Sequence, residues 1–329
     1  MKRSGFVAAL ALATLAFAGE QARLLVLHKA ASTLGFYTLE GKLLAQVPVG
    51  RHPHEMSLSA DGRLVYITDN GTMRIEDVAE GGNTVSVVDI EARKKIGEIS
   101  LGRFHRPHGI DLDPRTGHLL VSTENPDRLL LIDPAARRIL RTYDTQGKTA
   151  HIAIWGPGGR YAYVSNAGSG TVAAIELAGG GVKLIRAGDR PEGSARAPDG
   201  RFIYVANRES HRITVIDPAR NEAVGEIATG RGPVRVAVTP DGRMLVYALI
   251  HDQAVEFANA VSRKVLGSVK LEGPPVSLSL SRDGERAYAA VQDRDRVYCV
   301  SVRERRILRS FGTPTGAGPD PVRELPEKR

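Results

Sequence analysis

The sequence predicts an all-β protein, a seven-bladed β-propeller made of four-stranded antiparallel blades. Three observations support this fold class. Glycine-containing turns recur at a nearly constant spacing, strands of similar composition follow each turn, and no stretch shows the periodicity of a long helix. Of the 329 residues, 42% are hydrophobic and 25% are charged, which is typical of a globular protein with a full core.

The repeated turns divide the chain into units. Successive turn glycines are 41 or 42 residues apart, except for a first interval of 55 residues: Gly62, Gly117, Gly159, Gly200, Gly242 and Gly284. In one unit the turn is followed by the strands "RFIYVANR" (201–208), "RITVIDP" (212–218) and "EAVGEIATG" (222–230). Four short strands in a period of about 40–45 residues are typical of a propeller blade.

The ends of the chain complete the ring. Six full units account for residues 51–311, and residues 23–50 hold a second, third and fourth strand without a first. Residues 316–325 resemble an isolated first strand. We expect the two ends to pair in one composite blade, which removes the exposed edges of an open sheet. The longer first interval comes from a lid-like insertion, residues 71–82, in the first complete blade.

The first 18 residues have the features of a secretory signal peptide. Lys2 and Arg3 precede a short apolar run that ends in small residues at Ala16 and Ala18. We therefore expect a mature single-domain propeller over residues 19–329 that is periplasmic or secreted. No later stretch reaches the roughly 20 apolar residues of a spanning helix, so the mature chain is expected to have no transmembrane segment.

Charge and cysteine content limit the possible partners. The formal net charge is +8, and it becomes +6 without Lys2 and Arg3. This balance favours anionic partners in general, although the arginines are scattered and indicate a solvated basic surface. Aromatic residues make up only 5%, which argues against nucleic-acid binding by base stacking. The single cysteine, Cys299, lies in an apolar strand and is expected to be a small buried side chain.

One pair of segments carries a resemblance to a known family. "GRFIYVANRESHRITVIDP" (200–218) and "GRGPVRVAVTPDG" (230–242) resemble the YVTN-type β-propeller repeats, which are WD40-like, and the signal-bearing chain resembles periplasmic YncE-like proteins. The resemblance covers nearly the whole mature chain and implies an exported seven-bladed propeller. It leaves the function open, because related propellers include surface-layer proteins, nucleic-acid binders, metallochaperones and lactonases.

Two positions in each unit depart from the repeat, and both are predicted on the face of the ring opposite the Asp-Gly turns. The first lies eight residues before the turn glycine, or nine in the second unit, whose turn is longer. It is polar in four units and apolar in two: His54, His108, His151, Glu192, Val234 and Val276. The second lies seven residues after the glycine and divides in the same way: Asp69, Glu124, Asn166, Asn207, Leu249 and Val291.

Both positions are polar in the same four units and apolar in the same two, and this predicts a one-sided polar pocket at one mouth of the central channel. A few convergent polar groups beside apolar walls are what a small-molecule site needs. Arg208 and Arg235 adjoin these positions and suit a carboxylate or phosphate. We therefore expect an exported binding protein for a small anionic or metal-associated ligand. His52 precedes Pro53 and is expected to face solvent. The alternative is that polar residues at strand ends only satisfy local backbone groups.

Two kinds of metal site are compatible with these residues. His54, His108 and His151 suit zinc or copper, whereas Asp69, Glu124, Asn166 and Asn207 suit calcium or magnesium. The two sets cannot all bind one ion directly. Because the sequence contains no established metal-binding spacing, a divalent metal is one possible cofactor and its identity stays open.

Two further functions remain open alongside ligand binding. The first is a metal-dependent, lactonase-like hydrolase that uses His108 or His151 as general base and Arg208 or Arg235 to hold the developing oxyanion. The sequence lacks a Gly-x-Ser-x-Gly elbow, so binding without catalysis is favoured. The second is a scaffold for a protein partner, a common role of propellers.

Overall fold

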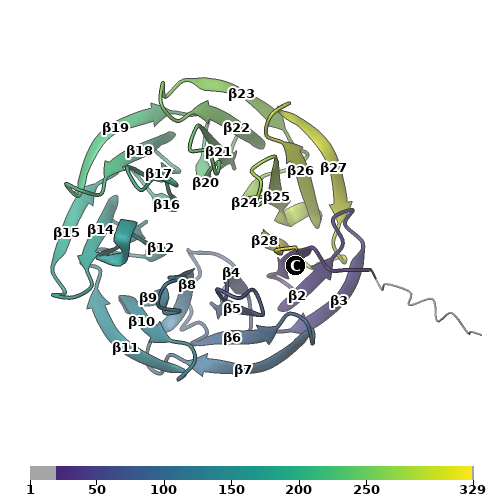
Figure 1. Cartoon of the computed structure of the whole chain (residues 1–329), viewed down its shortest axis with the longest axis horizontal. Helices are drawn as coiled ribbons and strands as arrows, with labels where there is room; N and C mark the ends of the chain where they lie inside the picture. Colours follow the sequence, from purple (N-terminus) through teal and green to yellow (C-terminus); the bar gives the residue numbers. More distant parts are fainter. Residues whose placement is uncertain (1–19, 328–329) are drawn as a thin grey trace, which may run out of the picture.

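The computed structural model describes residues 20–327 and forms a ring of seven four-stranded antiparallel sheets around a central channel (Figure 1). This confirms the predicted fold class and the number of blades. The predicted signal peptide, residues 1–18, lies outside the described residues. No helix among residues 20–327 is long and apolar enough to cross a membrane.

Blades 1 to 4 follow one another in the order of the sequence, and in each the first strand lies innermost (Figure 1). Their strands are β4 (Pro53–Leu58), β5 (Leu64–Asp69), β6 (Thr84–Asp89) and β7 (Lys94–Ser100); β8 (His105–Leu112), β9 (Leu119–Asn125), β10 (Asp127–Asp133) and β11 (Arg138–Asp144); β12 (Ala150–Trp155), β13 (Tyr161–Asn166), β14 (Thr171–Glu176) and β15 (Val182–Arg186); β16 (Pro191–Arg196), β17 (Ile203–Asn207), β18 (Arg212–Asp217) and β19 (Glu222–Ala228).

Blades 5 and 6 have the same order, and blade 7 combines the two ends of the chain. Their strands are β20 (Pro233–Val238), β21 (Met244–Leu249), β22 (Ala254–Asn259) and β23 (Val265–Lys270); β24 (Pro275–Leu280), β25 (Arg286–Val291), β26 (Arg296–Ser301) and β27 (Arg306–Gly312); β28 (Pro319–Glu324), β1 (Leu24–His28), β2 (Thr33–Tyr37) and β3 (Leu43–Pro48). Two short 3-10 turns complete the described elements: η1 (Pro157–Gly159) and η2 (Gln292–Arg294).

The hydrophobic core lies between neighbouring sheets rather than in one central mass. Val87 of blade 1 packs in one cluster with Val121 of blade 2, and Leu24 of blade 7 packs with Tyr288 and Cys299 of blade 6. Cys299 is fully buried, as expected. Each fully buried side chain of this kind stabilises the fold by about 1.5–3 kcal/mol. Stability therefore depends on each blade having two neighbours.

Blade 7 closes the ring as predicted. Strand β28 pairs with β1 in antiparallel register, with Leu24 opposite Glu324 and Val26 opposite Val322. Beyond the strand, the Leu325 N–H donates to the carbonyl of Arg23 at 2.8 Å, and the Leu325 side chain is buried. The last strand of the chain thereby covers the edge of the first.

The turns of blades 1, 5 and 6 share a hydrogen bond from a Ser or Thr hydroxyl to the Asp carboxylate. In blade 5, Thr239 Oγ1 donates to Asp241 Oδ1 at 2.6 Å, and the same carboxylate oxygen accepts the Arg243 N–H at 3.0 Å. Gly242 follows with a φ of 72°, a left-handed conformation that glycine adopts without strain. Because this pattern is local in sequence, it makes the blade boundaries easy to recognise.

Two inner-strand glycines let neighbouring blades approach backbone to backbone. A Cβ added at Gly193 of β16 would lie 2.6 Å from the carbonyl oxygen of Val234 in β20, and one at Gly109 of β8 would lie 2.7 Å from that of His151 in β12. Only glycine fits such close approaches. They bring the start of each inner strand close to the starts of its neighbours.

Removing β28 tests the closure. We expect a chain that ends at Gly318 to unfold at a midpoint temperature at least about 8 °C below that of the full chain. The reason is that the buried side chains of Val322 and Leu325 are removed and the edge of β1 becomes exposed. Circular dichroism during heating measures the midpoint. A chain that ends at Pro326 is the control, since it keeps β28 and Leu325 and, of the described residues, loses only Glu327, the exposed partner of Arg23. Equal midpoints for both truncated chains would contradict closure by β28.

Candidate functional site

The first four inner strands bring their predicted polar residues together at one mouth of the channel. In each of these blades, one inner-strand residue lies opposite a residue near the end of the second strand: Pro53 and Asp69, Pro107 and Thr123, Ala150 and Asn166, Pro191 and Asn207. The next inner-strand residue is the predicted one, and all four are at most 5% exposed: His54, His108, His151 and Glu192.

The three histidines form a continuous row across blades 1, 2 and 3. Nδ1 of His54 lies 3.2 Å from Nε2 of His108, and the ring centroids of His108 and His151 are 3.7 Å apart. Two further contacts extend from this row. Nε2 of His54 lies 3.0 Å from the carbonyl oxygen of Thr72, and Nδ1 of His108, the middle histidine, lies 2.7 Å from Oε1 of Glu124.

For uncharged imidazoles, these contacts determine where the protons lie. A carbonyl oxygen only accepts, so Nε2 of His54 carries the proton and Nδ1 of a neutral His54 accepts. Nε2 of His108 then donates to His54, which leaves Nδ1 of a neutral His108 as an acceptor. The partner of that nitrogen, Glu124, must therefore be the protonated donor. His108 and His54 therefore form a hydrogen-bonded relay that runs from the Glu124 carboxyl to the Thr72 carbonyl.

The electrostatics of the site agree with this assignment. Burial, opposed by the charges of Arg106 and Lys29, raises the pKa of Glu124 to about 7. Burial holds the pKa of His108 well below 6.5, and the nearby Arg235, Lys29 and Arg106 act in the same direction. Burial likewise holds the pKa values of His54 and His151 well below 6.5. Near neutral pH the imidazoles are uncharged and Glu124 retains a proton in a large fraction of molecules.

The insertion between β5 and β6 lies over this relay and is held to it at two points. The carbonyl of Thr72 is the acceptor for His54, and the guanidinium of Arg106 donates to the carbonyls of Asp77 and Ile75 at 2.6 and 2.9 Å. Nη2 of Arg106 also lies 2.8 Å from Oε2 of Glu124. A cavity of about 650 Å³ lies where the insertion meets Arg106 and Glu124.

The insertion also reaches across the mouth to blade 4. The carboxylate of Glu76 accepts a very short hydrogen bond from Arg190, and its Oε1 lies 3.9 Å from Nη2 of Arg208. Both arginines also contact one oxygen of Glu192, at 2.8 and 3.2 Å. Three carboxylates thus contact the two guanidinium groups: Glu192 of the blade, Glu76 of the insertion, and Glu209, whose Oε1 lies 2.9 Å from Nε of Arg208.

Two further ion pairs lie beside the histidines in the channel. Nη2 of Arg235 lies 2.6 Å from Oε1 of Glu55, and Nζ of Lys29 lies 3.4 Å from Oδ2 of Asp320. The charges of Glu55, Asp320 and Glu192 outweigh burial and raise the pKa of Arg235. Arg235 is therefore neutralised by a fixed partner within the protein. The sequence predicts that Arg235 donates to a ligand, whereas in the structure Arg235 donates to Glu55.

Sequence reasoning missed six residues of this mouth: Lys29, Glu55, Glu76, Arg106, Arg190 and Asp320. Part of the signal was present. Glu55 and Arg235 each follow a predicted mouth position by one residue and have opposite charges. Asp320 follows Pro319, which lies opposite His28, so Asp320 in blade 7 corresponds to His54 in blade 1. Blade 7 has no turn glycine from which this position could be counted.

The second predicted position holds two different groups of residues. Asp69, Asn166 and Asn207 bond near their own blades: Asp69 accepts from Gly50, Thr84 and Ser86. The Asn166 amide donates to Thr171 of blade 3 and to Thr145 in the connection from blade 2, and the Asn207 amide donates within blade 4. Glu124 alone of the four reaches the histidines. The structure therefore does not gather all four residues into one site.

Strand pairing explains the difference. Thr123, and not Glu124, occupies the place that Asp69 has in blade 1, because both lie opposite the proline that precedes the mouth histidine. Successive residues of a strand point to opposite faces, so a shift of one residue exchanges the two faces. Counted this way, Glu124 corresponds to Asn70 in blade 1 and to Arg208 in blade 4, and this is the position that faces the mouth.

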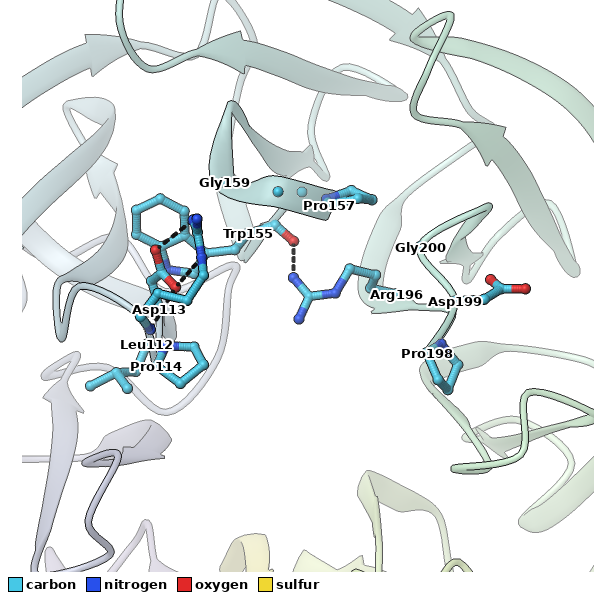
Figure 2. Close-up of a pocket in the computed structure, with 13 residues that line it drawn as sticks. Leu112, Asp113, Pro114, Trp155, Pro157, Gly159, Arg196, Pro198, Asp199 and Gly200 are labelled. Carbon is cyan, nitrogen blue, oxygen red and sulfur yellow. Dashed lines mark hydrogen bonds and ion pairs between the residues drawn. The ribbon is translucent and has the colours of Figure 1, made fainter.

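The remaining sequence expectation concerns His52, and neither His52 nor Trp155 is part of the relay. Nδ1 of His52 lies 3.2 Å from the carbonyl of Lys29, and its side chain is partly exposed. Trp155 lines a cavity of about 350 Å³ on the turn face together with Asp113, Asp199 and Gly200 (Figure 2). The polar groups of that cavity have their own partners, since Arg196 donates to the Trp155 carbonyl at 2.7 Å and Arg115 to Asp113 at 3.0 Å.

The arrangement of the histidines does not favour a metal. Within residues 20–327, no group of three or more His, Cys, Asp or Glu side chains is arranged to hold a metal ion. Nδ1 of His54 and Nε2 of His108 face each other, so the nitrogen lone pair that a zinc or copper ion would need is directed at a neighbouring ring. The oxygen ligands proposed for calcium are divided among separate blades.

Comparisons with known proteins support the fold and part of the family resemblance. Residues 103–265 match the family described as "Lactonase, 7-bladed beta-propeller". This match agrees with the seven-bladed propeller and leaves the YVTN-type, YncE-like resemblance a prediction. Among curated proteins, none matches the sequence.

Three solved structures are similar in fold. Hydrazine synthase of Kuenenia stuttgartiensis is 19% identical over 76% of each chain, with a TM-score of 0.65. A functionally unknown protein of Desulfotomaculum acetoxidans is 13% identical over 93% of this chain and 99% of that one, with a TM-score of 0.77. Dihydro-heme d1 dehydrogenase NirN in complex with DHE is 17% identical over 93% and 67% of the two chains, with a TM-score of 0.66. At these identities the likeness extends to the fold alone.

The protonation of Glu124 can be tested by the pH dependence of stability. Because its folded pKa of about 7 exceeds the ordinary value of 4.5, this group stabilises the fold below the ordinary value, and that contribution is lost as the pH rises through about 7. We expect wild type to lose up to about 3 kcal/mol more free energy of unfolding than Glu124→Gln between pH 5 and pH 8. Urea denaturation at several pH values measures this difference.

The control for this experiment is Glu98→Gln, a change at an exposed glutamate on the outer strand β7. Its stability should follow that of wild type at every pH. Parallel curves for wild type and Glu124→Gln would show that Glu124 is ionised throughout and would contradict the assigned relay.

Proposed function

We propose that this chain is an exported binding protein that holds a small anionic ligand at the mouth where the insertion covers the histidine row. The observation that carries the proposal is the convergence of His54, His108 and His151 with the arginines of blade 4 at one end of the channel. The signal-like start of the sequence supports export, with a periplasmic or secreted location. The likeness to other propellers is consistent with this role and identifies no ligand.

The arginines of blade 4 are the groups of the mouth that suit an anion. Lys29 and Arg235 are each paired with one acid, whereas Arg190 and Arg208 contact Glu192 of the blade and Glu76 of the insertion, and Arg208 also contacts Glu209. Glu124 contributes less than a full negative charge near neutral pH, because burial raises its pKa to about 7. A buried, water-poor site strengthens the attraction between its guanidinium groups and an anionic ligand.

The mouth also offers groups that can orient a ligand. Nδ1 of His151 and Oδ1 of Asp320 are buried and have no hydrogen-bond partner within the described part of the chain. Val234 lies at the same inner-strand position, and its buried side chain packs in the hydrophobic cluster between blades 5 and 6. Unpaired buried polar atoms cost stability, and a ligand with a matching donor or acceptor would offset that cost. Such a site selects ligands by their polar groups as well as by their charge.

A lactone or ester hydrolase is the second candidate, favoured by the family match over residues 103–265 and by the relay. His151 has a pKa well below 6.5 and is neutral at pH 7, and its Nδ1 has no hydrogen-bond partner within the described residues, so it can accept a proton from an attacking water. Both nitrogens of His108 are already engaged in the relay. A guanidinium of the mouth would hold the developing oxyanion. A divalent metal could supply a more acidic water if bound, although the histidine row is not arranged to hold one.

Ligand binding can be measured by thermal stabilisation against a panel of carboxylates, phosphates and sulfonates. A ligand at 100 times its dissociation constant stabilises the folded protein by about 2.7 kcal/mol. We expect at least one anion to raise the unfolding midpoint of wild type. The apparent affinity for that anion, obtained from the midpoint shifts, should be at least tenfold weaker in Arg208→Gln. Arg201→Gln is the matched control, since Arg201 lies in the same blade on the turn face and is exposed.

No stabilisation by any anion, together with a protein partner retained from the same extract, would contradict the proposal and favour a scaffold. The anion panel is therefore measured before any search for a protein partner.

The hydrolase alternative makes a different prediction. The binding proposal predicts no turnover of lactones or esters above the uncatalysed rate. Turnover that falls at least 100-fold in His151→Ala, measured by release of acid at constant pH, would overturn binding without catalysis. Addition of a chelator to the active protein would then separate metal-assisted from metal-free hydrolysis.

A further inference from the structure

The contact between Glu76 and blade 4 is the most unusual feature of the mouth. Glu76 lies in the insertion of blade 1, whereas Arg190 and Arg208 belong to blade 4, and the two blades are separated around the ring by blades 2 and 3 (Figure 1). The contact therefore crosses the opening of the channel. It joins the insertion, which contains no helix or strand, to two arginines of blade 4.

The two arginines are held in place without Glu76. Nε of Arg190 and Nη1 of Arg208 both contact Oε1 of Glu192, a residue that is 5% exposed. These contacts direct Nη2 of each guanidinium toward Glu76. Glu192 and Glu209, whose Oε1 lies 2.9 Å from Nε of Arg208, would remain beside the two guanidinium groups if the insertion moved away. Nη2 of Arg190 and Nη2 of Arg208 would then lose their contact with Glu76 and be available to an anion.

Glu76 is bound as a ligand would be. Its side chain is 57% exposed, unlike the buried acids around it, and the insertion supplies its carboxylate from outside the channel. Partial burial opposes ionisation, but the hydrogen bond and charge of Arg190 outweigh it and hold the pKa of Glu76 below its ordinary value. The carboxylate is therefore ionised when it meets the two guanidinium groups.

We propose that Arg190 and Arg208 are the seat for the carboxylate group of the ligand, and that Glu76 occupies this seat in the free protein as an internal competitor. This inference rests on the proposed function and makes the ligand class narrower: the anion is a carboxylate, the group that already fits the seat. Binding requires the insertion to lift, which also removes the Thr72 carbonyl from His54. The ligand thereby gains access to the histidine row at the same time as it takes the seat.

Replacing Glu76 tests the competition directly. Glu76→Gln keeps the size of the side chain and removes its charge, and Glu76→Ala removes the group that would occupy the seat. We expect both variants to bind the carboxylates of the panel at least tenfold more tightly than wild type, by titration calorimetry, because the competent state becomes the major one. The gain should be absent when Arg208→Gln is added.

Glu80→Gln is the matched control. It makes the same charge change in the same insertion, and the ion-pair partner of Glu80 is His105 rather than the arginines of blade 4. Its affinity for carboxylates should equal that of wild type. A gain as large as that of Glu76→Gln would reveal a general effect of charge and would overturn the proposal.

Movement of the insertion has its own readout. Arg74 is exposed in the insertion, so trypsin can cleave after it when the segment is released. We expect cleavage at Arg74 to accelerate at least threefold in Glu76→Ala and in wild type saturated with a carboxylate, as followed by mass spectrometry. Cleavage that is equally slow in all three samples would overturn the lifting of the insertion.

The two proposals fail in different ways. If wild type and Glu76→Gln bind an anion equally, the competition is wrong while the binding function stands. If phosphates or sulfonates bind and carboxylates do not, the assigned ligand class is wrong and an anion site remains. If neither protein binds any anion, both the seat and the proposed function are wrong.

Discussion

The pairing of β28 with β1 closes the ring, and the other features of the molecule depend on that closure. Each sheet buries its two faces against neighbouring blades, so a ring with an open edge would leave one sheet half uncovered. Closure also fixes seven inner strands around one axis. Because every inner strand starts at the same end of the channel, the first residues of different blades meet there, although they are far apart in the sequence.

Such a meeting point concentrates polar groups that would be costly to bury singly. An isolated buried charge costs several kcal/mol, and the mouth reduces that cost by pairing. Arg235 lies against Glu55, Lys29 against Asp320, and the imidazoles share protons with Glu124. The insertion contributes backbone carbonyls and Glu76 to the same network. The mouth is therefore held together by many interdependent contacts, and a change at one of them alters the protonation or position of its neighbours.

The sequence predicts the architecture well because the relevant signals are local. Recurring glycine turns, of the form Ser/Thr-x-Asp-Gly in blades 1, 5 and 6, mark the repeats, and counting back from the glycine identifies His54 and His151 at the mouth. Counting forward fails in blade 2, where one residue of difference in the turn places Glu124 rather than Thr123 at the chosen position. The contact between Glu76 and Arg190 spans the channel, and no local pattern of residues indicates it.

Blade 7 makes the mouth dependent on both ends of the chain. Lys29 and Asp320 are 291 positions apart, yet they form one ion pair beside the histidines. During synthesis, Lys29 emerges early, and the pair can form only after the chain has been made as far as β28, which supplies Asp320. Until then Lys29 lacks the carboxylate that neutralises it, and the ring is open beside it. Assembly of the mouth is thereby coupled in time to ring closure.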